Sequence, residues 1–216
     1  MLRTTIALLL LVPAGTAYAG DNEVSLTETA RALHTDSANA VTEDGMVTGT
    51  LGYARHIDIP IIENLTLWAT GNFSWGGTSG EMFQTMTTDV GTLMFAAGGR
   101  AQYQLHRLVV ASARLDVGTT RASLTLEDEE GHSAQAKGWG PMSQVGLGLD
   151  LYAVNKPNFT FGLRLELGYV ATGNIDMTAG PPSESNDTLH LQMTAASLGS
   201  LNLSGSTFAA SVVSQF

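Results

Sequence analysis

Stretches in which apolar and polar side chains alternate recur along most of this chain of 216 residues. In the segment 159–169 every odd-numbered residue is apolar, and the polar residues Thr160, Arg164 and Glu166 lie between them. A period of two residues is typical of a β-strand that has one apolar and one polar face. The alternation predicts an all-β fold and leaves open which medium contacts the apolar faces.

The same alternation occurs in several other segments, 46–56, 65–75, 92–105, 108–120, 142–152 and 205–216. Tight connections are expected near 57–60, 106–107 and 155–157, and long polar loops over 76–89, over 122–140 and from 171 onward. Strands of about ten alternating residues, joined in turn by tight turns and long loops, are typical of an outer-membrane β-barrel. The sequence therefore predicts an eight-stranded antiparallel transmembrane β-barrel, an up-and-down meander with short periplasmic turns and long exterior loops.

Two strand counts both give eight strands. Counting from Met46 and adding a strand at 189–195 places the long loops on the same side as the chain ends, whereas barrels of this class keep both ends with the short turns. We therefore take 23–33 as the first strand, and 171–204 as a fourth exterior loop. Within that loop, the segment LHLQMTAASLGSLNLSG, 189–205, is expected to be a strand extension or a small hairpin. The alternative for the first segment is a periplasmic helix over 26–39, which contains good helix formers.

The first nineteen residues, MLRTTIALLLLVPAGTAYA, are expected to be a secretory signal peptide. Arg3 supplies the positive charge, 6–12 the short apolar region, and Ala17-Tyr18-Ala19 the cleavage site before Gly20. The apolar run is shorter than the ~20 residues that a membrane-spanning helix needs. The predicted domains are thus a signal peptide, 1–19, and a barrel domain, 20–216.

Composition narrows the classes of partner and of stabilising device. The chain has no cysteine, so no disulfide supports it, and its formal net charge of −10 argues against nucleic acid as a partner. Four tyrosines near predicted strand ends are expected in the aromatic belts at the membrane boundaries, namely Tyr53, Tyr103, Tyr152 and Tyr169.

In each strand the alternate positions that hold polar residues are here called the polar parity. In the middle strands this polar parity has three basic and three acidic residues, Arg100, Arg114, Asp116, Asp150, Arg164 and Glu166. An eight-stranded barrel is wide enough only for its own side chains or one small ligand. Buried charges must be paired, because an unpaired one costs several kcal/mol. The balance of sign predicts a salt-bridged, closed lumen, since an ion path would favour one sign.

The signal peptide, the tight turns, the balanced inward charges and the final SVVSQF resemble the small eight-stranded outer-membrane proteins, the group of the OmpA transmembrane domain, OmpX and OmpW. The resemblance covers nearly the whole mature chain and implies a monomer in the outer membrane, in contact with the lipid bilayer and lipopolysaccharide. It further implies that Phe216 is the assembly signal read by the barrel-assembly machinery. Ser214 departs from the apolar residue usual two positions before the end.

Catalysis is not predicted. The five histidines, His34, His56, His106, His132 and His190, belong to no motif with fixed geometry, although Ser133 or Asp187 could assist those in the exterior loops. No cofactor site is predicted either. The acidic run Glu127, Asp128, Glu129 and Glu130 is a weak candidate for a divalent cation, because it lacks the ligand spacing of a calcium loop and such runs are usually solvated.

The sequence thus favours a non-enzymatic envelope or surface-interaction protein with a closed barrel. Two alternatives stay open: a narrow outer-membrane channel for small solutes, and a secreted soluble β-barrel that binds a ligand in its core.

Overall fold

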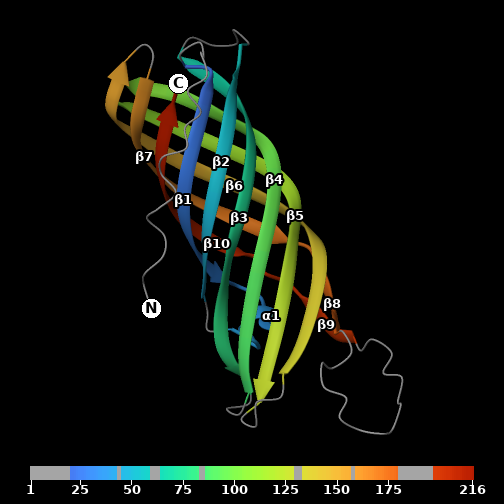
Figure 1. The fold of residues 1–216 in the computed structure, drawn as a ribbon. Coiled ribbons are helices and arrows are strands. Elements are labelled where there is room, and N and C mark those ends of the chain that lie inside the picture. The colour runs from blue at the N-terminus through green and yellow to red at the C-terminus, as the bar shows by residue number, and fades with distance from the viewer. Residues whose placement is uncertain are drawn as a thin grey trace, which may run out of the picture.

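Eight long strands form a closed antiparallel ring (Figure 1). The computed structural model describes residues 20–42, 45–58, 64–82, 86–128, 133–156, 159–179 and 197–216. The ring strands are β1 (Asn22–Leu33), β2 (Gly45–Ile57), β3 (Leu65–Met82), β4 (Met86–His106), β5 (Val109–Asp128), β6 (Ser133–Lys156), β7 (Phe159–Thr172) and β10 (Gly205–Gln215). Neighbours in the chain pair with each other, and β10 closes the ring by pairing with both β7 and β1.

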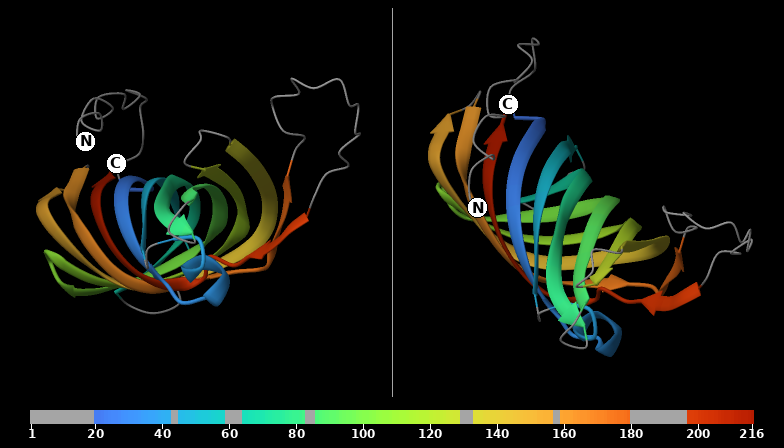
Figure 2. Two further views of the ribbon diagram at one scale, coloured as in Figure 1. Left: turned by 90° about the horizontal axis from the view of Figure 1, so that it is seen from below. Right: turned by 60° about the horizontal axis from the view of Figure 1, so that its bottom comes forward.

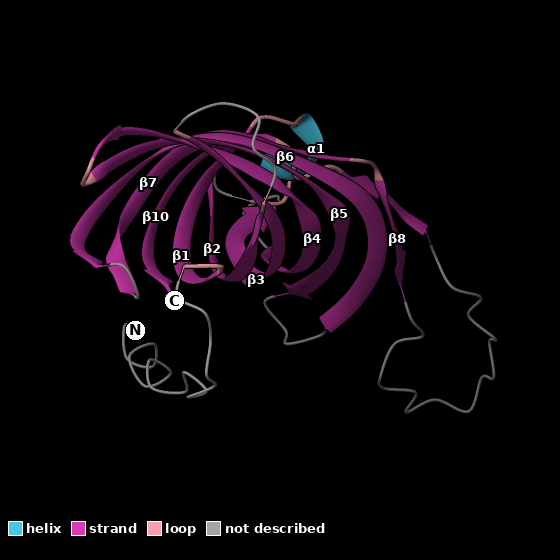
Figure 3. Cartoon of the chain, turned by 90° about the horizontal axis from the view of Figure 1, so that it is seen from above, coloured by secondary structure: helices cyan, strands magenta, loops and turns pink. Residues whose placement is uncertain are grey.

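Two further strands and a short helix complete the described chain. The strands β8 (Ile175–Ala179) and β9 (Ser197–Leu201) pair with each other, and β8 also pairs with Ala136 and Lys137 of β6. Figure 2 shows this pair projecting from the side of the ring. The helix α1 (Asp36–Asn39) follows β1, and Figure 3 shows strand nearly everywhere else. Within the described ranges, no helix has the length and apolar character to cross a membrane.

The two ends of the barrel differ. At one end, here called the terminal rim, Asn22 and Phe216 exchange backbone hydrogen bonds of 3.1 and 2.9 Å, and the turn at Arg107 joins β4 to β5. At the other end, here called the loop rim, lie α1, β8, β9 and the far ends of β3 to β6 (Figure 1). The two ends of the barrel domain therefore lie with the short turns, as predicted.

The first strand is where the sequence places it. β1 pairs with β10 from Glu23 opposite Gln215 to Leu33 opposite Gly205. The alternative of a helix over 26–39 is wrong, because only 36–39 are helical. Of the segment 189–205, β9 is a strand, but it pairs with β8, which precedes that segment, so the two strands of the observed hairpin come from both ends of the predicted loop. Residues 180–196 lie outside the described residues.

Two segments predicted as exterior loops are largely strand. β3 and β4 run on to Met82 and from Met86, and β5 and β6 run on to Asp128 and from Ser133. The alternation in these extensions has the opposite sense to that in the middle of the barrel. In β5, Leu115 and Val117 face outward, whereas Ala122 and Leu124 face inward and are buried. These segments were predicted as loops because their outward-facing side chains are polar, whereas the prediction expected apolar side chains on the outward face of every strand.

The outward face of the middle of the barrel is apolar and uncovered. Leu147 is 71% exposed, Leu167 65% and Val117 60%. Each of the eight ring strands carries at least one large apolar side chain that is more than a third exposed. An apolar surface of this extent is unfavourable in water and fits a face that contacts hydrocarbon.

Aromatic side chains lie near both edges of this apolar belt. Tyr53, Tyr103 and Tyr169 face outward, as expected for boundary residues. Tyr152 does not: it is 8% exposed and points into the barrel, so its assignment to the belt was wrong. Even-numbered residues of β6 face the lumen up to the register shift that follows Tyr152.

The charged interior as the candidate functional site

The structure directs all six charged side chains of the polar parity into the barrel. Arg100 comes from β4, Arg114 and Asp116 from β5, Asp150 from β6, and Arg164 and Glu166 from β7. Each side chain is buried or nearly so, and they lie in two groups along the barrel axis. β1 adds Glu23, which lies fully buried among them.

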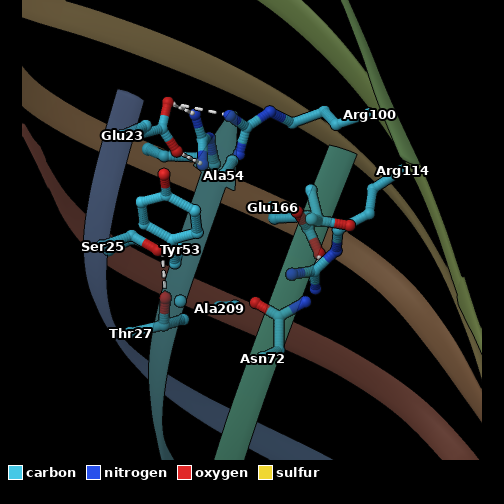
Figure 4. A pocket seen from close by; sticks show the side chains of 14 residues that line it. Glu23, Ser25, Thr27, Tyr53, Ala54, Asn72, Arg100, Arg114, Glu166 and Ala209 are labelled. Carbon is cyan, nitrogen blue, oxygen red and sulfur yellow. Dashed lines mark hydrogen bonds and ion pairs between the residues drawn. The ribbon is translucent and has the colours of Figure 1, made fainter. Parts of the chain in front are cut away.

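The first charge cluster consists of Glu23, Arg100, Asp150 and Arg164. Arg164 donates to both oxygens of Glu23, at 3.0 and 3.1 Å, and to both oxygens of Asp150, at 2.6 and 2.8 Å. Arg100 Nη2 lies 2.8 Å from Glu23 Oε2, and Figure 4 shows the two groups facing each other. Two bases and two acids therefore neutralise one another, with bidentate geometry on both sides of Arg164.

Neutral side chains satisfy the remaining oxygens of the first cluster. Gln102 Nε2 donates to Asp150 Oδ2 at 2.7 Å, and Gln215 Nε2 donates to Glu23 Oε2 at 3.0 Å. The Tyr152 hydroxyl accepts from Gln215 at 3.0 Å and points to Asp150 Oδ2 at 3.4 Å. The inward position of Tyr152 thus joins the network to the terminal strand.

Trp68 is the one apolar residue among the even-numbered, otherwise polar residues of 65–75 in β3. Its side chain is buried inside the barrel, with the guanidinium of Arg100 5.6 Å from the ring centroid. The ring of His56 lies 5.4 Å away on the other neighbouring strand, β2. A cation over an indole face is attracted by the ring quadrupole, so the apolar residue supports the charge cluster.

The second charge cluster consists of Arg114, Asp116 and Glu166. Arg114 Nη2 donates to Glu166 Oε1 at 2.6 Å, and its Nε lies 3.3 Å from Asp116 Oδ2. The Thr70 hydroxyl donates to Asp116 Oδ1 at 2.6 Å, and Asn72 donates to Oδ2 at 3.2 Å. One base faces two acids, so this cluster carries one excess negative charge.

Arg31 supplies the compensating positive charge. It is buried, donates to the carbonyl of Leu203 at 3.2 Å, and contacts Met94 Sδ at 3.4 Å. Among the described residues it has no carboxylate partner. The interior therefore holds four arginines and four acids, namely Arg31, Arg100, Arg114, Arg164, Glu23, Asp116, Asp150 and Glu166.

Sequence reasoning missed Glu23 and Arg31, because the alternation in β1 is weak. The signal was present: both residues lie on the parity opposite Val24 and Leu26, which face outward.

Glycines let the charged side chains cross the lumen. A Cβ at Gly146 would lie 2.5 Å from Glu166 Oε1, and one at Gly98 would lie 2.5 Å from Asp116 Oδ1. Side chains at these positions would collide with the second cluster, so the absence of Cβ atoms there makes room for the ion pairs.

Little empty space remains between the charged groups. A cavity of about 10 Å³ lies between the two clusters (Figure 4), and one of about 20 Å³ lies between Arg31 and Arg114. Each has room for about one water molecule. A wider recess of about 200 Å³ opens at the terminal rim and ends at Trp68, Gln102 and Tyr152.

The loop rim is filled by apolar side chains. They come from β1, β2, α1 and the segment after it, the extended strands β4 to β6, β8, and β9 with the segment after it: Leu33, Ala38, Val41, Met46, Val90, Ala122, Leu124, Ala136, Ile175, Met177, Leu201 and Leu203. Backbone contacts hold the covering segments, since Thr88 Oγ1 donates to the carbonyl of Val41, and the amide of Asn202 donates to Ser37 Oγ at 3.1 Å. This apolar core was not predicted.

The other candidate residues that the structure describes, His34, His56, His106 and Ser133, do not assemble into a site. His34 Nε2 lies 2.9 Å from Ser206 Oγ on the surface, and His56 lies 3.8 Å from Asp21 at the terminal rim. His106 ends β4, and Ser133 begins β6. His132, Asp187 and His190 lie outside the described residues.

The acidic run is only partly visible. Glu127 and Asp128 end β5, while Glu129 and Glu130 lie outside the described residues. In the part of the chain that the structure describes, no group of three or more possible metal-binding side chains occurs.

Comparison with known proteins identifies the fold only through structure. No family model matches the chain, and no curated protein matches it in sequence. Neisserial surface protein A (NspA) is similar, with a TM-score of 0.57 and 12% identity over 92% of this chain and 98% of that protein. Ail, the attachment invasion locus protein of Yersinia pestis, gives 0.47 and 12% over 91% and 97%. The outer membrane protein AlkL gives 0.34 and 15% over 94% of each chain.

The likeness to NspA, together with the closed ring and the apolar outer belt, confirms the predicted architecture. This chain has the fold of the small eight-stranded outer-membrane β-barrel proteins.

Proposed function

We propose that this protein is a closed, non-enzymatic barrel of the outer membrane that serves envelope integrity or surface interaction through its loop rim. The observation that carries the proposal is the double obstruction of the lumen. Salt-bridged side chains fill the middle of the barrel and leave cavities of about 10 and 20 Å³, and an apolar core fills the loop rim.

This obstruction argues against the alternative of a narrow channel. A hydrated solute would have to break bidentate ion pairs, such as those of Arg164 with Glu23 and Asp150. It would then have to pass an apolar layer in which polar groups are costly. Neither obstacle opens without moving side chains that hold each other in place.

The positions of polar and apolar side chains argue against the alternative of a soluble ligand-binding barrel. Such a protein places apolar side chains around its ligand and polar ones in water. In the middle of this barrel the arrangement is reversed, with Leu147 exposed outside and Asp150 buried inside.

The non-enzymatic part of the proposal follows from how the interior groups are used. The carboxylates of Glu23, Asp116, Asp150 and Glu166 each contact an arginine, so they are occupied within the barrel rather than free to act on a substrate. A general acid or base needs access to the reacting atom.

The proposal includes the route to the membrane. Residues 1–19 are removed as a signal peptide before Gly20, Phe216 is read by the barrel-assembly machinery, and the mature monomer contacts lipid and lipopolysaccharide. The terminal rim then faces the periplasm and the loop rim the cell exterior.

The test is conductance in planar bilayers. Folded protein, verified by its shifted mobility on unboiled gels, should give no steady openings, whereas the double variant Glu166→Ala/Leu203→Ala, which weakens both the charge cluster and the apolar core, should leak. The outward variant Glu28→Ala provides a matched control for removal of a carboxylate. Steady openings from the intact protein would refute the closed lumen, and extraction of the native protein without detergent would refute the membrane location.

A further inference from the structure

The few cations of this chain have an uneven distribution. Besides Arg3, the chain has nine lysines and arginines. Four lie in the lumen, and three lie at the terminal rim: Arg55, Arg107 and Lys156. The remaining two, Arg121 and Lys137, both lie on the outer wall toward the loop rim. In a chain of formal net charge −10, the loop-rim half of the outer wall thus has two cations, and they are neighbours.

The strand register brings these two side chains together. Arg121 of β5 lies opposite Trp139 of β6, and Lys137 lies opposite Ser123, so Arg121 and Lys137 are diagonal neighbours on one face. Long side chains reach one another across a diagonal pair. The guanidinium of Arg121 lies 5.9 Å from the centroid of Trp139, a distance at which the ring attracts and orients it.

In the part of the chain that the structure describes, neither Arg121 nor Lys137 forms an ion pair with an acidic side chain, whereas Arg100, Arg114 and Arg164 in the lumen all do. Lys137 is exposed and Arg121 is half-buried against its neighbours. A pair of uncompensated cations on an acidic protein is a complementary surface for an anion.

The position of Arg121 and Lys137 along the barrel axis indicates which kind of molecule carries the anion. Below Arg121 on β5 the outward residues Val117 and Leu115 belong to the apolar belt. On β4, Leu93 lies directly opposite Arg121, and it is the last outward-facing large apolar residue before Asp89. Trp139 is the kind of side chain that marks a membrane boundary. The two cations therefore lie at headgroup level, immediately beyond the hydrocarbon.

We propose that Arg121 and Lys137, with Trp139 as a stacking platform, form a binding site for a phosphate group of a membrane glycolipid in the outer leaflet. Arginine binds phosphate oxygens with two parallel N–H groups, and lysine adds a point charge. The acyl chains of the same lipid lie along the apolar belt below. This inference rests on the proposed membrane function and names one lipid contact of the loop-rim half.

The test measures lipid binding to the full mature protein in detergent micelles by native mass spectrometry. The probes are bis-phosphorylated lipid A, its dephosphorylated form, and inorganic phosphate as a competitor. The double variant Arg121→Gln/Lys137→Gln removes the site, and Arg55→Gln/Lys156→Gln removes the same charge from the terminal rim as a matched control. Mobility on unboiled gels establishes that each variant is folded.

The dissociation constant for phosphorylated lipid A should rise about tenfold or more in the site variant, which is the effect of losing one charge-assisted hydrogen bond, and should stay unchanged in the control. Dephosphorylated lipid A should bind all forms equally. Equal losses in both variants, or binding that ignores the phosphates, would overturn the inference. Full displacement of the lipid by millimolar phosphate would also overturn it, because it would indicate a site for free anions. The proposed function has a separate readout, since a folded barrel that blocks conductance satisfies it whatever the lipid result.

Discussion

Arg164 offers the sharpest test of the interior. It makes four charge-assisted hydrogen bonds, two to Glu23 and two to Asp150. In Arg164→Met, Glu23 retains Arg100 at 2.8 Å, but Asp150 loses the one cation with which it forms a direct ion pair among the described residues. Breaking a buried pair by removing one partner costs about 3–5 kcal/mol, because a charge is left uncompensated.

The structure therefore predicts that Arg164→Met lowers the free energy of unfolding by about 4 kcal/mol. Adding Asp150→Asn should recover more than half of that loss, because the amide still accepts from Gln102 and no charge is stranded. Adding Glu23→Gln instead should recover less, since it leaves Asp150 charged and unpaired and takes from Arg100 its own partner.

The assay is urea unfolding in detergent or lipid vesicles, followed by tryptophan fluorescence and by mobility on unboiled gels. Arg55→Met is the control, because Arg55 is exposed at the terminal rim and should change the stability by less than about 0.5 kcal/mol. The reasoning is refuted if Arg164→Met unfolds like the control, or if Asp150→Asn and Glu23→Gln rescue it equally.

Three further predictions concern other layers of the barrel. Gly146→Ala should cost about 1–3 kcal/mol, because its Cβ would lie 2.5 Å from Glu166, whereas Gly71→Ala meets nothing within 4 Å; equal unfolding midpoints would contradict this. Leu203→Ala should cost about 2–4 kcal/mol and raise the rate at which added protease cuts 34–42, and an unchanged cleavage rate would show that the apolar core does not hold that segment. Glu28 faces outward from β1 between apolar neighbours, so Glu28→Leu should stabilise the barrel in lipid by about 1 kcal/mol, and a lower unfolding midpoint in vesicles would count against a lipid-facing position.

Much of the ring could be predicted because apolar outward residues and polar inward residues alternate along most of its strands. β7 alternates without interruption from Phe159 to Tyr169, and the charged residues of its polar parity, Arg164 and Glu166, both lie in the lumen. In β1 the alternation is weaker, since Glu28 interrupts the outward face and threonines fill the inward one. Glu23 and Arg31 were therefore missed, although both alternate with the outward residues Val24 and Leu26.

The sequence could not predict which charged side chains form ion pairs with each other. Arg164 and Glu23 are separated by most of the chain, and they meet because β1 and β10 close the ring next to β7. Alternation determines which side of a strand a residue faces. It does not determine the stagger between strands, which decides which charges share a level of the lumen.

The medium around each strand changes along its length, and the sense of the alternation changes with it. Where the wall contacts hydrocarbon, apolar side chains face outward and the interior must be polar and paired. Beyond the belt, β5 carries Ser123 and Thr125 outward and Ala122 and Leu124 inward, which is the pattern of a protein in water with an apolar core. The barrel thus joins a membrane domain and a water-exposed domain on the same strands. Arg121 lies where one sense gives way to the other, so our proposal gives this cation a lipid phosphate as its partner, whereas Arg100, Arg114 and Arg164 in the lumen pair with carboxylates.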